Sequence, residues 1–146
     1  MQKGRIVYTG GSFDTPHVGH IDLLNWCRLL AGSGKVIVAL NTDEFILRYK
    51  GKPPIYSYAD RKTMLLAFKD LVDEVIANTD GEDSRPTILK VKPDVIVIGS
   101  DWLKKDYCKQ MGFTPEWLEE HRIALCYIPR YINMSSTMIK EKLCQG

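Results

Sequence analysis

The sequence has no apolar run long enough to span a bilayer, and its first residues lead into a predicted strand instead of a cleavable leader. Its charges nearly cancel, with 20 basic against 18 acidic residues and a net charge of +2. Such a balance argues against a broad surface for polyanions. We therefore expect a protein that neither inserts into a membrane nor takes nucleic acid as its main partner.

Cysteine is scarce and is not spaced as in metal or redox motifs. No two cysteines form a Cys-x-x-Cys pair, which excludes the commonest zinc and dithiol patterns. Reduced thiols in a cytoplasmic protein explain them better than disulfides do. The four residues are Cys27, Cys108, Cys126 and Cys144.

What the sequence does contain is a regular alternation of apolar, β-branched runs with amphipathic segments. This alternation predicts one domain over residues 1–146, folded as a doubly wound parallel α/β sheet of the Rossmann type. Gly112 and Pro115 should interrupt exposed helices within residues 103–122. Predicted strands lie at 6–9, 35–40, 73–77, 95–98 and 124–128, and predicted helices begin near residues 19, 44, 57, 86 and 135. Ligands bind beyond the carboxyl ends of such strands, so polar residues after them are candidates for a site.

The most informative segment joins the first predicted strand to the first helix. Gly10 and Gly11 follow residues 6–9 and should let the backbone turn sharply and approach a ligand closely. His17 and His20 fall in the first turn of the helix, where unpaired N–H groups and the helix dipole favour an anion. This placement suits phosphate oxygens. A metal half-site or simple helix capping is the alternative, but no further ligands stand at a suitable spacing.

Residues Gly11-Ser12-Phe13-Asp14 and His17-Val18-Gly19-His20 resemble the signature of the cytidylyltransferase-like nucleotidyltransferases. In that family the His-x-Gly-His segment holds the α- and β-phosphates of a nucleoside triphosphate. The resemblance spans nearly the whole chain and is weakest over residues 103–122. It implies a catalytic role for both histidines. It also implies nucleotide binding by Gly11, Ser12, Phe13 and Asp14, although Asp14 alone would suit a turn that bonds its own backbone.

Two basic segments also resemble the family. In Lys50-Gly51-Lys52, a lysine would neutralise charge as the α-phosphate is attacked; Lys50 is the first candidate and Lys52 the second. Arg61 would clamp a phosphate of the acceptor or the nucleotide through its planar fork. Without the resemblance, the lysines would be an exposed basic loop and Arg61 half of a surface ion pair.

The last candidates follow the two final predicted strands. Arg130 would supply fixed charge to the phosphates, and the hydroxyls opening the helix near residue 135 would make a second anion-binding terminus. Without the resemblance, Ser135 and Ser136 would be ordinary helix caps, and Trp102 would be an ordinary core residue. The resemblance assigns nucleotide binding to Gly99, Asp101, Trp102, Ser135, Ser136 and Thr137.

Taken together, the resemblance implies transfer of CMP from CTP to a phosphorylated small alcohol similar to glycerol 3-phosphate, with release of pyrophosphate. The acceptor phosphate is already nucleophilic, so catalysis amounts to alignment and neutralisation of charge. Magnesium would be held mainly by the nucleotide phosphates, with no metal site built by the protein alone. A cytoplasmic homodimer is also implied.

Several positions depart from the family pattern and leave the base and the acceptor open. They are Thr15-Pro16, Ser100, Tyr131 and Met134–Thr137. Segments 83–86 and 92–94 are similar to ADP-heptose-type adenylyltransferases, so ATP with a sugar phosphate or flavin phosphate is an alternative. A nucleotide-binding module without turnover is a further alternative, and it predicts binding without magnesium-dependent release of pyrophosphate.

Overall fold

A computed structural model describes residues 4–79, 82–129 and 136–145 of the chain. Its centre is a sheet of five parallel strands in the order β3-β2-β1-β4-β5. The strands are β1 (Ile6–Gly11), β2 (Lys35–Asn41), β3 (Glu74–Asn78), β4 (Val95–Gly99) and β5 (Ala124–Ile128). This order confirms the predicted doubly wound sheet. Successive strands are added on one side of β1 up to β3 and on its other side from β4 onward. The order therefore reverses between β1 and β4, which is where such sheets bind ligands.

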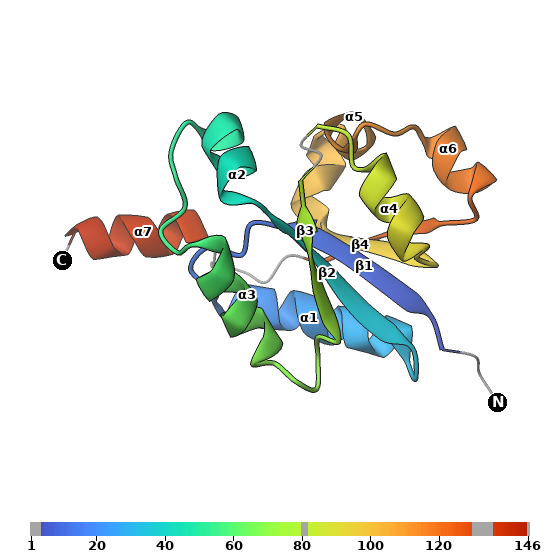
Figure 1. Cartoon of the computed structure of the whole chain (residues 1–146), viewed down its shortest axis with the longest axis horizontal. Helices are drawn as coiled ribbons and strands as arrows, with labels where there is room; N and C mark the ends of the chain where they lie inside the picture. The colour runs from blue at the N-terminus through green and yellow to red at the C-terminus, as the bar shows by residue number, and fades with distance from the viewer. Residues whose placement is uncertain (1–3, 80–81, 130–135, 146) are drawn as a thin grey trace.

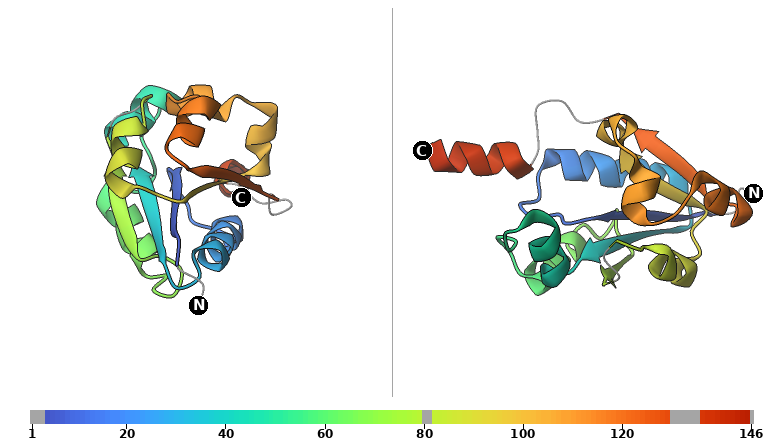
Figure 2. Two further views of the ribbon diagram at one scale, coloured as in Figure 1. Left: turned by 90° about the vertical axis from the view of Figure 1, so that its right-hand side faces the viewer. Right: turned by 90° about the horizontal axis from the view of Figure 1, so that it is seen from above.

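Helices cover both faces of the sheet (Figure 1). Helices α1 and α3 pack on one face, and α4, α5 and α6 pack on the other. Helices α2 and α7 lie toward the end at which the strands finish, and α7 extends outward from there (Figures 1 and 2). The bounds are α1 (Val18–Ala31), α2 (Asp43–Lys50), α3 (Tyr58–Leu66), α4 (Arg85–Val91), α5 (Tyr107–Met111), α6 (Pro115–Glu120) and α7 (Ser136–Gln145), with a 3-10 turn η1 (Ser100–Lys104) after β4.

The strand side chains alternate between two apolar layers, as a sheet covered on both faces requires. On β2, Val36 and Val38 pack on the side of α1, whereas Ala39 packs with Ile88 of α4 and Leu118 of α6. The alternation explains the uninterrupted apolar run of this strand, because both of its faces are buried.

Residues 103–122 follow the predicted interruptions but are less exposed than expected. Gly112 ends α5 in the left-handed conformation, with φ 80°, and Pro115 begins α6. Tyr107 and Leu118, however, are buried against the sheet. This stretch is therefore a wall of the core, built from short helices whose apolar sides face inward.

Two local predictions are wrong. Lys50 is the last residue of α2 and not part of a loop, because Gly51 with φ 72° provides the helix end. Gly10 and Gly11 lie within β1, and the turn after it is made by Phe13 and Thr15, with φ 47° and 60°. A residue other than glycine is strained by about 1–2 kcal/mol in this left-handed region, because its Cβ lies too close to the following carbonyl oxygen. Such strain is typical of segments that are held in place by a functional site.

In the part of the chain described here, no helix combines the length and apolarity that crossing a bilayer requires. All four cysteines carry free thiols.

Candidate active site

A cavity of about 440 Å³ opens at the carboxyl ends of the strands, where the sheet order reverses. The N-terminus of α1, the end of α2, η1 and α5 complete its walls. The predicted site residues that line it are Gly11, Ser12, Phe13, Asp14, His17, His20, Lys50, Gly99, Asp101 and Trp102. The fold thus brings together candidates that are spread over about ninety positions of the chain.

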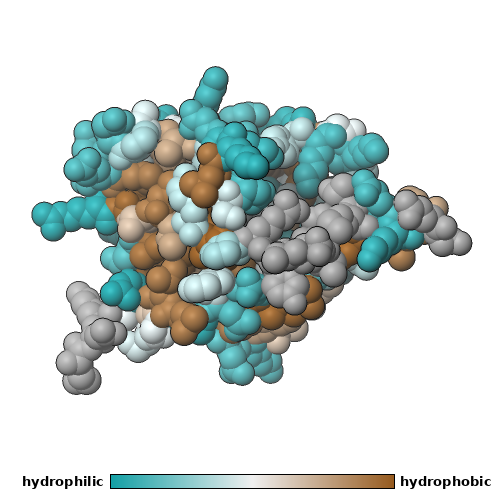
Figure 3. Space-filling model, turned by 180° about the vertical axis from the view of Figure 1, so that it is seen from behind, coloured by the Kyte–Doolittle hydropathy of each residue, from teal (hydrophilic) through white to brown (hydrophobic). Residues whose placement is uncertain are grey.

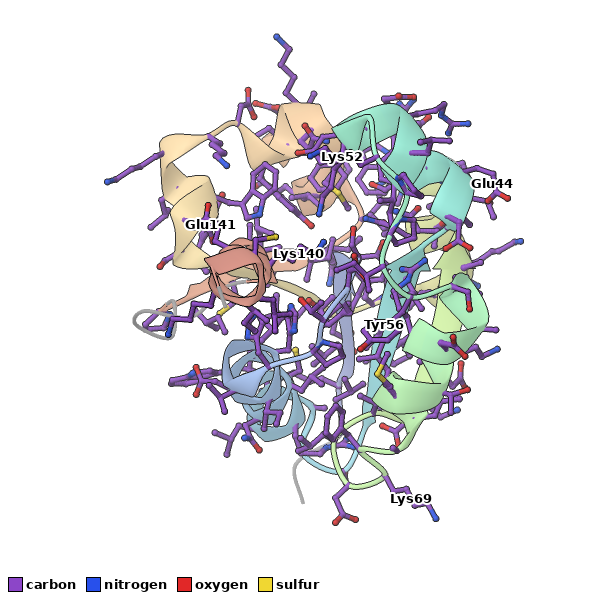
Figure 4. The ribbon with its side chains drawn as sticks, turned by 90° about the vertical axis from the view of Figure 1, so that its left-hand side faces the viewer. Glu44, Lys52, Tyr56, Lys69, Lys140 and Glu141 are labelled. Atoms are coloured by element: carbon purple, nitrogen blue, oxygen red, sulfur yellow. The ribbon has the colours of Figure 1, made fainter. Side chains whose placement is uncertain are left out.

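Other candidates are not placed in the cavity wall. Lys52 is exposed in the loop after α2 and is not one of the lining residues, so its role stays a prediction (Figure 4). Arg130 and Ser135 lie outside the described residues. Ser136 and Thr137 begin α7 as expected, but their side chains also lie outside the described part.

The two histidines stack at the N-terminus of α1, with ring centroids 3.8 Å apart. His17 is the N-cap, and its Nδ1 accepts the Gly19 N–H at 3.0 Å. The backbone N–H of His17 in turn donates to Nδ1 of His20 at 3.3 Å. Because each Nδ1 is an acceptor, each neutral ring carries its hydrogen on Nε2. Capping and phosphate binding are thus compatible, since they use different nitrogens.

His20 is a neutral donor at physiological pH. Burial, followed by the nearby His17, lowers the pKa of His20 to about 3. The buried Phe13 ring lies against it, with centroids 4.9 Å apart. A ring held neutral in this way can donate Nε2–H to a phosphate oxygen but brings no positive charge. The charge has to come from other residues.

Lys50 and Lys140 supply positive charge close together at this end of the sheet. Partial burial, followed by the charge of Lys140, lowers the pKa of Lys50. Lys140 extends from α7 toward the middle of the strand ends (Figure 4), where its Nζ donates to Asp14 Oδ2 at 2.9 Å. Sequence analysis missed Lys140; the available signal was its position one turn after Ser136, in a helix expected to bind phosphate.

Asp14 fixes the segment between α2 and α3 beside the cavity. Its carboxylate accepts the N–H groups of Ile55 at 2.9 Å and Tyr56 at 3.1 Å, as well as the Lys140 ammonium. Burial acts to raise the pKa of Asp14, but these hydrogen bonds outweigh it and hold the pKa below its usual value. Two of these partners are backbone groups 41 and 42 residues away, so Asp14 organises tertiary structure. Its role toward a nucleotide stays a prediction.

We expect Asp14→Asn to lower the free energy of unfolding by about 1–3 kcal/mol at pH 7, because Lys140 loses its carboxylate and a buried acceptor is lost. A lowered folded pKa stabilises above the ordinary value of 3.8, and this stabilisation is lost as the pH falls through the folded pKa. The variant should lack that acid-dependent loss. Urea unfolding from pH 7 to pH 3 measures both effects. The exposed Asp70→Asn is the matched control, and equal midpoints for the two variants would contradict the role.

Arg61 lies beneath the cavity and not in its wall. It is fully buried, and its guanidinium donates to the carbonyls of Ser12 at 2.8 Å, Asn41 at 2.9 Å and Tyr56 at 2.9 Å. A fourth bond of 2.6 Å joins it to the Asp43 carboxylate. This position departs from the predicted phosphate clamp, because the guanidinium is fully buried outside the cavity wall and four of its five N–H donors are already bound to protein acceptors. Arg61 instead positions the ends of β1 and β2.

Two asparagines at strand ends, Asn41 and Asn78, were not predicted as part of the site, and they continue a row of polar side chains from the predicted residue Ser12. Asn41 and Asn78 pair in register across β2 and β3. Asn78 Nδ2 donates to Asn41 Oδ1 at 2.9 Å, and Asn41 Nδ2 donates to Ser12 Oγ at 3.1 Å. All three residues line the cavity. The signal in the sequence was an asparagine directly after each apolar run, which is equally typical of a helix cap or a loop.

Gly99 and η1 form the wall on the other side of the reversal point. A Cβ on Gly99 would lie 2.7 Å from Asp101 Oδ1, so the glycine leaves space for that carboxylate. Trp102 meets Tyr107 edge to face, with centroids 5.4 Å apart, and packs partly against the core. The tryptophan therefore belongs to both the core and the cavity wall.

A parallel sheet with paired imidazoles at a helix N-terminus beside its reversal point defines an α/β protein equipped to bind phosphate groups. The family model described as cytidylyltransferase-like matches residues 8–142. The chain belongs to the cytidylyltransferase-like family of nucleotidyltransferases.

Individual relatives carry different names. Glycerol-3-phosphate cytidylyltransferase of Bacillus subtilis is 36% identical over 138 residues, covering 94% of this chain and 95% of that protein. FAD synthase of Pyrococcus abyssi is 44% identical over 95 residues, covering 65% of this chain and 62% of that protein. The bifunctional protein HldE of Helicobacter hepaticus is 30% identical, but this chain spans only 29% of its length.

Solved structures share the fold. The lipopolysaccharide core biosynthesis protein of Thermoplasma volcanium aligns with a TM-score of 0.68 and 27% identity, covering 88% of this chain and 99% of that one. Thermotoga maritima TmcAL bound with alpha-thio ATP aligns with a TM-score of 0.65 over 97% of this chain and 50% of that one. At 17% identity, the second likeness concerns the fold alone.

Proposed function

We propose that this protein transfers CMP from CTP to a phosphorylated small alcohol of the glycerol 3-phosphate type and releases pyrophosphate. The observation that carries the proposal is the stacked pair of His17 and His20 at the N-terminus of α1, lining a cavity at the reversal point of the sheet. The near full-length similarity to the Bacillus subtilis enzyme supports the choice of nucleotide and acceptor.

In this reaction an acceptor phosphate oxygen attacks the α-phosphorus of CTP. The bond from that phosphorus to the bridging oxygen breaks, and the bonding electrons leave with pyrophosphate. The Nε2–H groups of His17 and His20 would donate to phosphate oxygens as negative charge builds up on them. Because His20 is neutral, Lys50 and Arg130 would supply the compensating charge. No general base is needed, since the attacking phosphate is already ionised at neutral pH.

Magnesium fits this site as a companion of the nucleotide. Among the described residues, no three His, Cys, Asp or Glu side chains are grouped closely enough to hold a metal ion. Three carboxylates line the cavity. Asp14 is bonded to Lys140 and to two backbone N–H groups, whereas Asp22 and Asp101 belong to α1 and η1. Magnesium in such sites is held by one or two carboxylates together with substrate phosphates. When bound, it would neutralise charge on the leaving pyrophosphate.

Adenylyl transfer from ATP to a sugar phosphate or flavin phosphate is the second candidate, favoured by the similarity to FAD synthase and HldE. Purified protein is incubated with magnesium, either CTP or ATP, and glycerol 3-phosphate, a heptose phosphate or FMN. We expect release of pyrophosphate with CTP and glycerol 3-phosphate. Release with ATP alone would select the second candidate. Nucleotide binding without release would identify a module that has no turnover.

We also propose a homodimer. Val18, Trp26 and Leu29 of α1 are exposed, and β5 is an open edge of the sheet. Apolar side chains gather on the face that Figure 3 shows. A contiguous apolar area of this kind is typical of a contact with another protein. A second copy of the chain would cover both the exposed apolar side chains of α1 and the open edge at β5.

A further inference from the structure

Two buried polar side chains at the cavity are not used by the phosphate chemistry. Asn78 lines the cavity and is 5% exposed, and Tyr8 is completely buried in β1, beneath the lining residue Gly10. Within the described residues, Asn78 Oδ1 and the Tyr8 hydroxyl are buried without a hydrogen-bond partner. Tyr8 faces the α4–α6 layer of the sheet, opposite the α1 layer from which the histidines extend.

Buried polar atoms without a protein partner beside a cavity indicate that a ligand provides the missing hydrogen bond. A buried donor or acceptor without a partner destabilises a protein by about 1–3 kcal/mol, so few are retained. Asn78 cannot simply swing toward another protein group, because its Nδ2 is bonded to Asn41 and Asn41 is bonded to Ser12. The amide oxygen is therefore a fixed acceptor.

The backbone leaves space above the tyrosine hydroxyl. Gly10 lines the cavity two residues after Tyr8 on the same strand, and therefore on the same face of the sheet. A Cβ on Gly10 would lie 3.5 Å from the hydroxyl oxygen. The neighbouring strand offers only Ala39 in register with Gly10. Tyr8 does not itself line the cavity, but its hydroxyl lies against the lining residue Gly10, and the absence of a side chain there gives a small, polar ligand room to approach it.

We propose that Asn78 and Tyr8 bind the hydroxyl groups on the carbon skeleton of the acceptor and so select a polyol phosphate over a deoxy analogue. This inference rests on the proposed function and specifies the acceptor class. Asn78 Oδ1 accepts from one hydroxyl, while the Tyr8 hydroxyl donates to or accepts from another. Gln110 and Met111 of α5 also line the cavity, which gives residues 103–122 a part in shaping the acceptor end.

The test measures binding by calorimetry, with CTP present and divalent ions removed so that no turnover occurs. The probes are glycerol 3-phosphate and n-propyl phosphate, which differ by two hydroxyl groups. We expect the wild type to bind glycerol 3-phosphate about 10–100-fold more tightly. Asn78→Leu and Tyr8→Phe should each reduce this ratio to less than about 3-fold. Asn41 is only half-buried, so it can bond to solvent when Asn78 is replaced.

Thr9→Val is the matched control, because Thr9 is equally buried but its hydroxyl already donates to the Val97 carbonyl at 2.9 Å. It should lower the melting temperature and keep the ratio of affinities. Tyr8→Phe should keep or raise the melting temperature, since it removes an unpartnered group. A merely structural role for Tyr8 and Asn78 would move stability and leave the ratio unchanged.

Equal affinities of the wild type for the two phosphates, no measurable binding of glycerol 3-phosphate, or an unchanged ratio in Asn78→Leu would each overturn the inference. Other results would refute the proposed function without refuting this inference. A protein that shows the expected ratio but never releases pyrophosphate would refute the reaction alone. Pyrophosphate release with an unchanged ratio in Asn78→Leu would refute the inference alone.

Discussion

Replacing His17 or His20 with alanine is expected to lower kcat for pyrophosphate release by about 100-fold or more. Each ring offers Nε2–H as a donor because its Nδ1 is bonded to a backbone N–H. Alanine removes that donor where charge develops on the phosphates. His17→Ala also removes the N-cap of α1, at about 1 kcal/mol of stability. Initial rates with saturating CTP and acceptor measure the effect on kcat.

His121→Ala is the control, because this third histidine is exposed on the ring of Trp117 at the end of α6. It should keep the wild-type kcat. Circular dichroism and melting curves check that the variants are folded. Full turnover in folded His17→Ala or His20→Ala would refute the assignment of that histidine.

The lowered pKa of His20 has a consequence for stability. Between its folded value of about 3 and its ordinary value of 6.5, the unfolded chain binds a proton that the folded chain does not. The free energy of unfolding should therefore fall as the pH drops from 6.5 toward 3, and His20→Asn should reduce this dependence.

Arg61→Leu is expected to lower the free energy of unfolding by about 3–5 kcal/mol. It removes a fully buried guanidinium and leaves three carbonyl oxygens and the part-exposed Asp43 carboxylate without their donor. Arg61→Lys should not restore full stability, because one ammonium cannot reach four acceptors arranged around a planar fork. Urea denaturation at pH 7 measures both variants.

Arg85→Leu is the matched control. Arg85 is exposed and pairs with Asp83, so its loss should leave the urea midpoint close to that of the wild type. If Arg61→Leu were as stable as Arg85→Leu but had a greatly raised KM for the acceptor, Arg61 would be a phosphate ligand after all.

Local sequence was sufficient to predict the alternating strands and helices, a helix start near residue 19, where α1 begins at Val18, and the interruptions at Gly112 and Pro115. These features depend on residues within one or two turns of each other, because side-chain periodicity and capping act over that range. The candidate phosphate site could be predicted for the same reason, since both of its histidines lie on one helix turn.

The tertiary structure alone decided what surrounds that turn. Arg61 is a buried positioning residue because acceptors from four other positions converge on it, the farthest 49 residues away. Asp14 finds Lys140 at a separation of 126 residues, and Asn78 reaches the cavity only because β3 lies beside β2. Hydrogen-bond partners so far apart in the sequence are brought together by the order of the strands in the sheet. The spacing of residues along the chain does not predict that order.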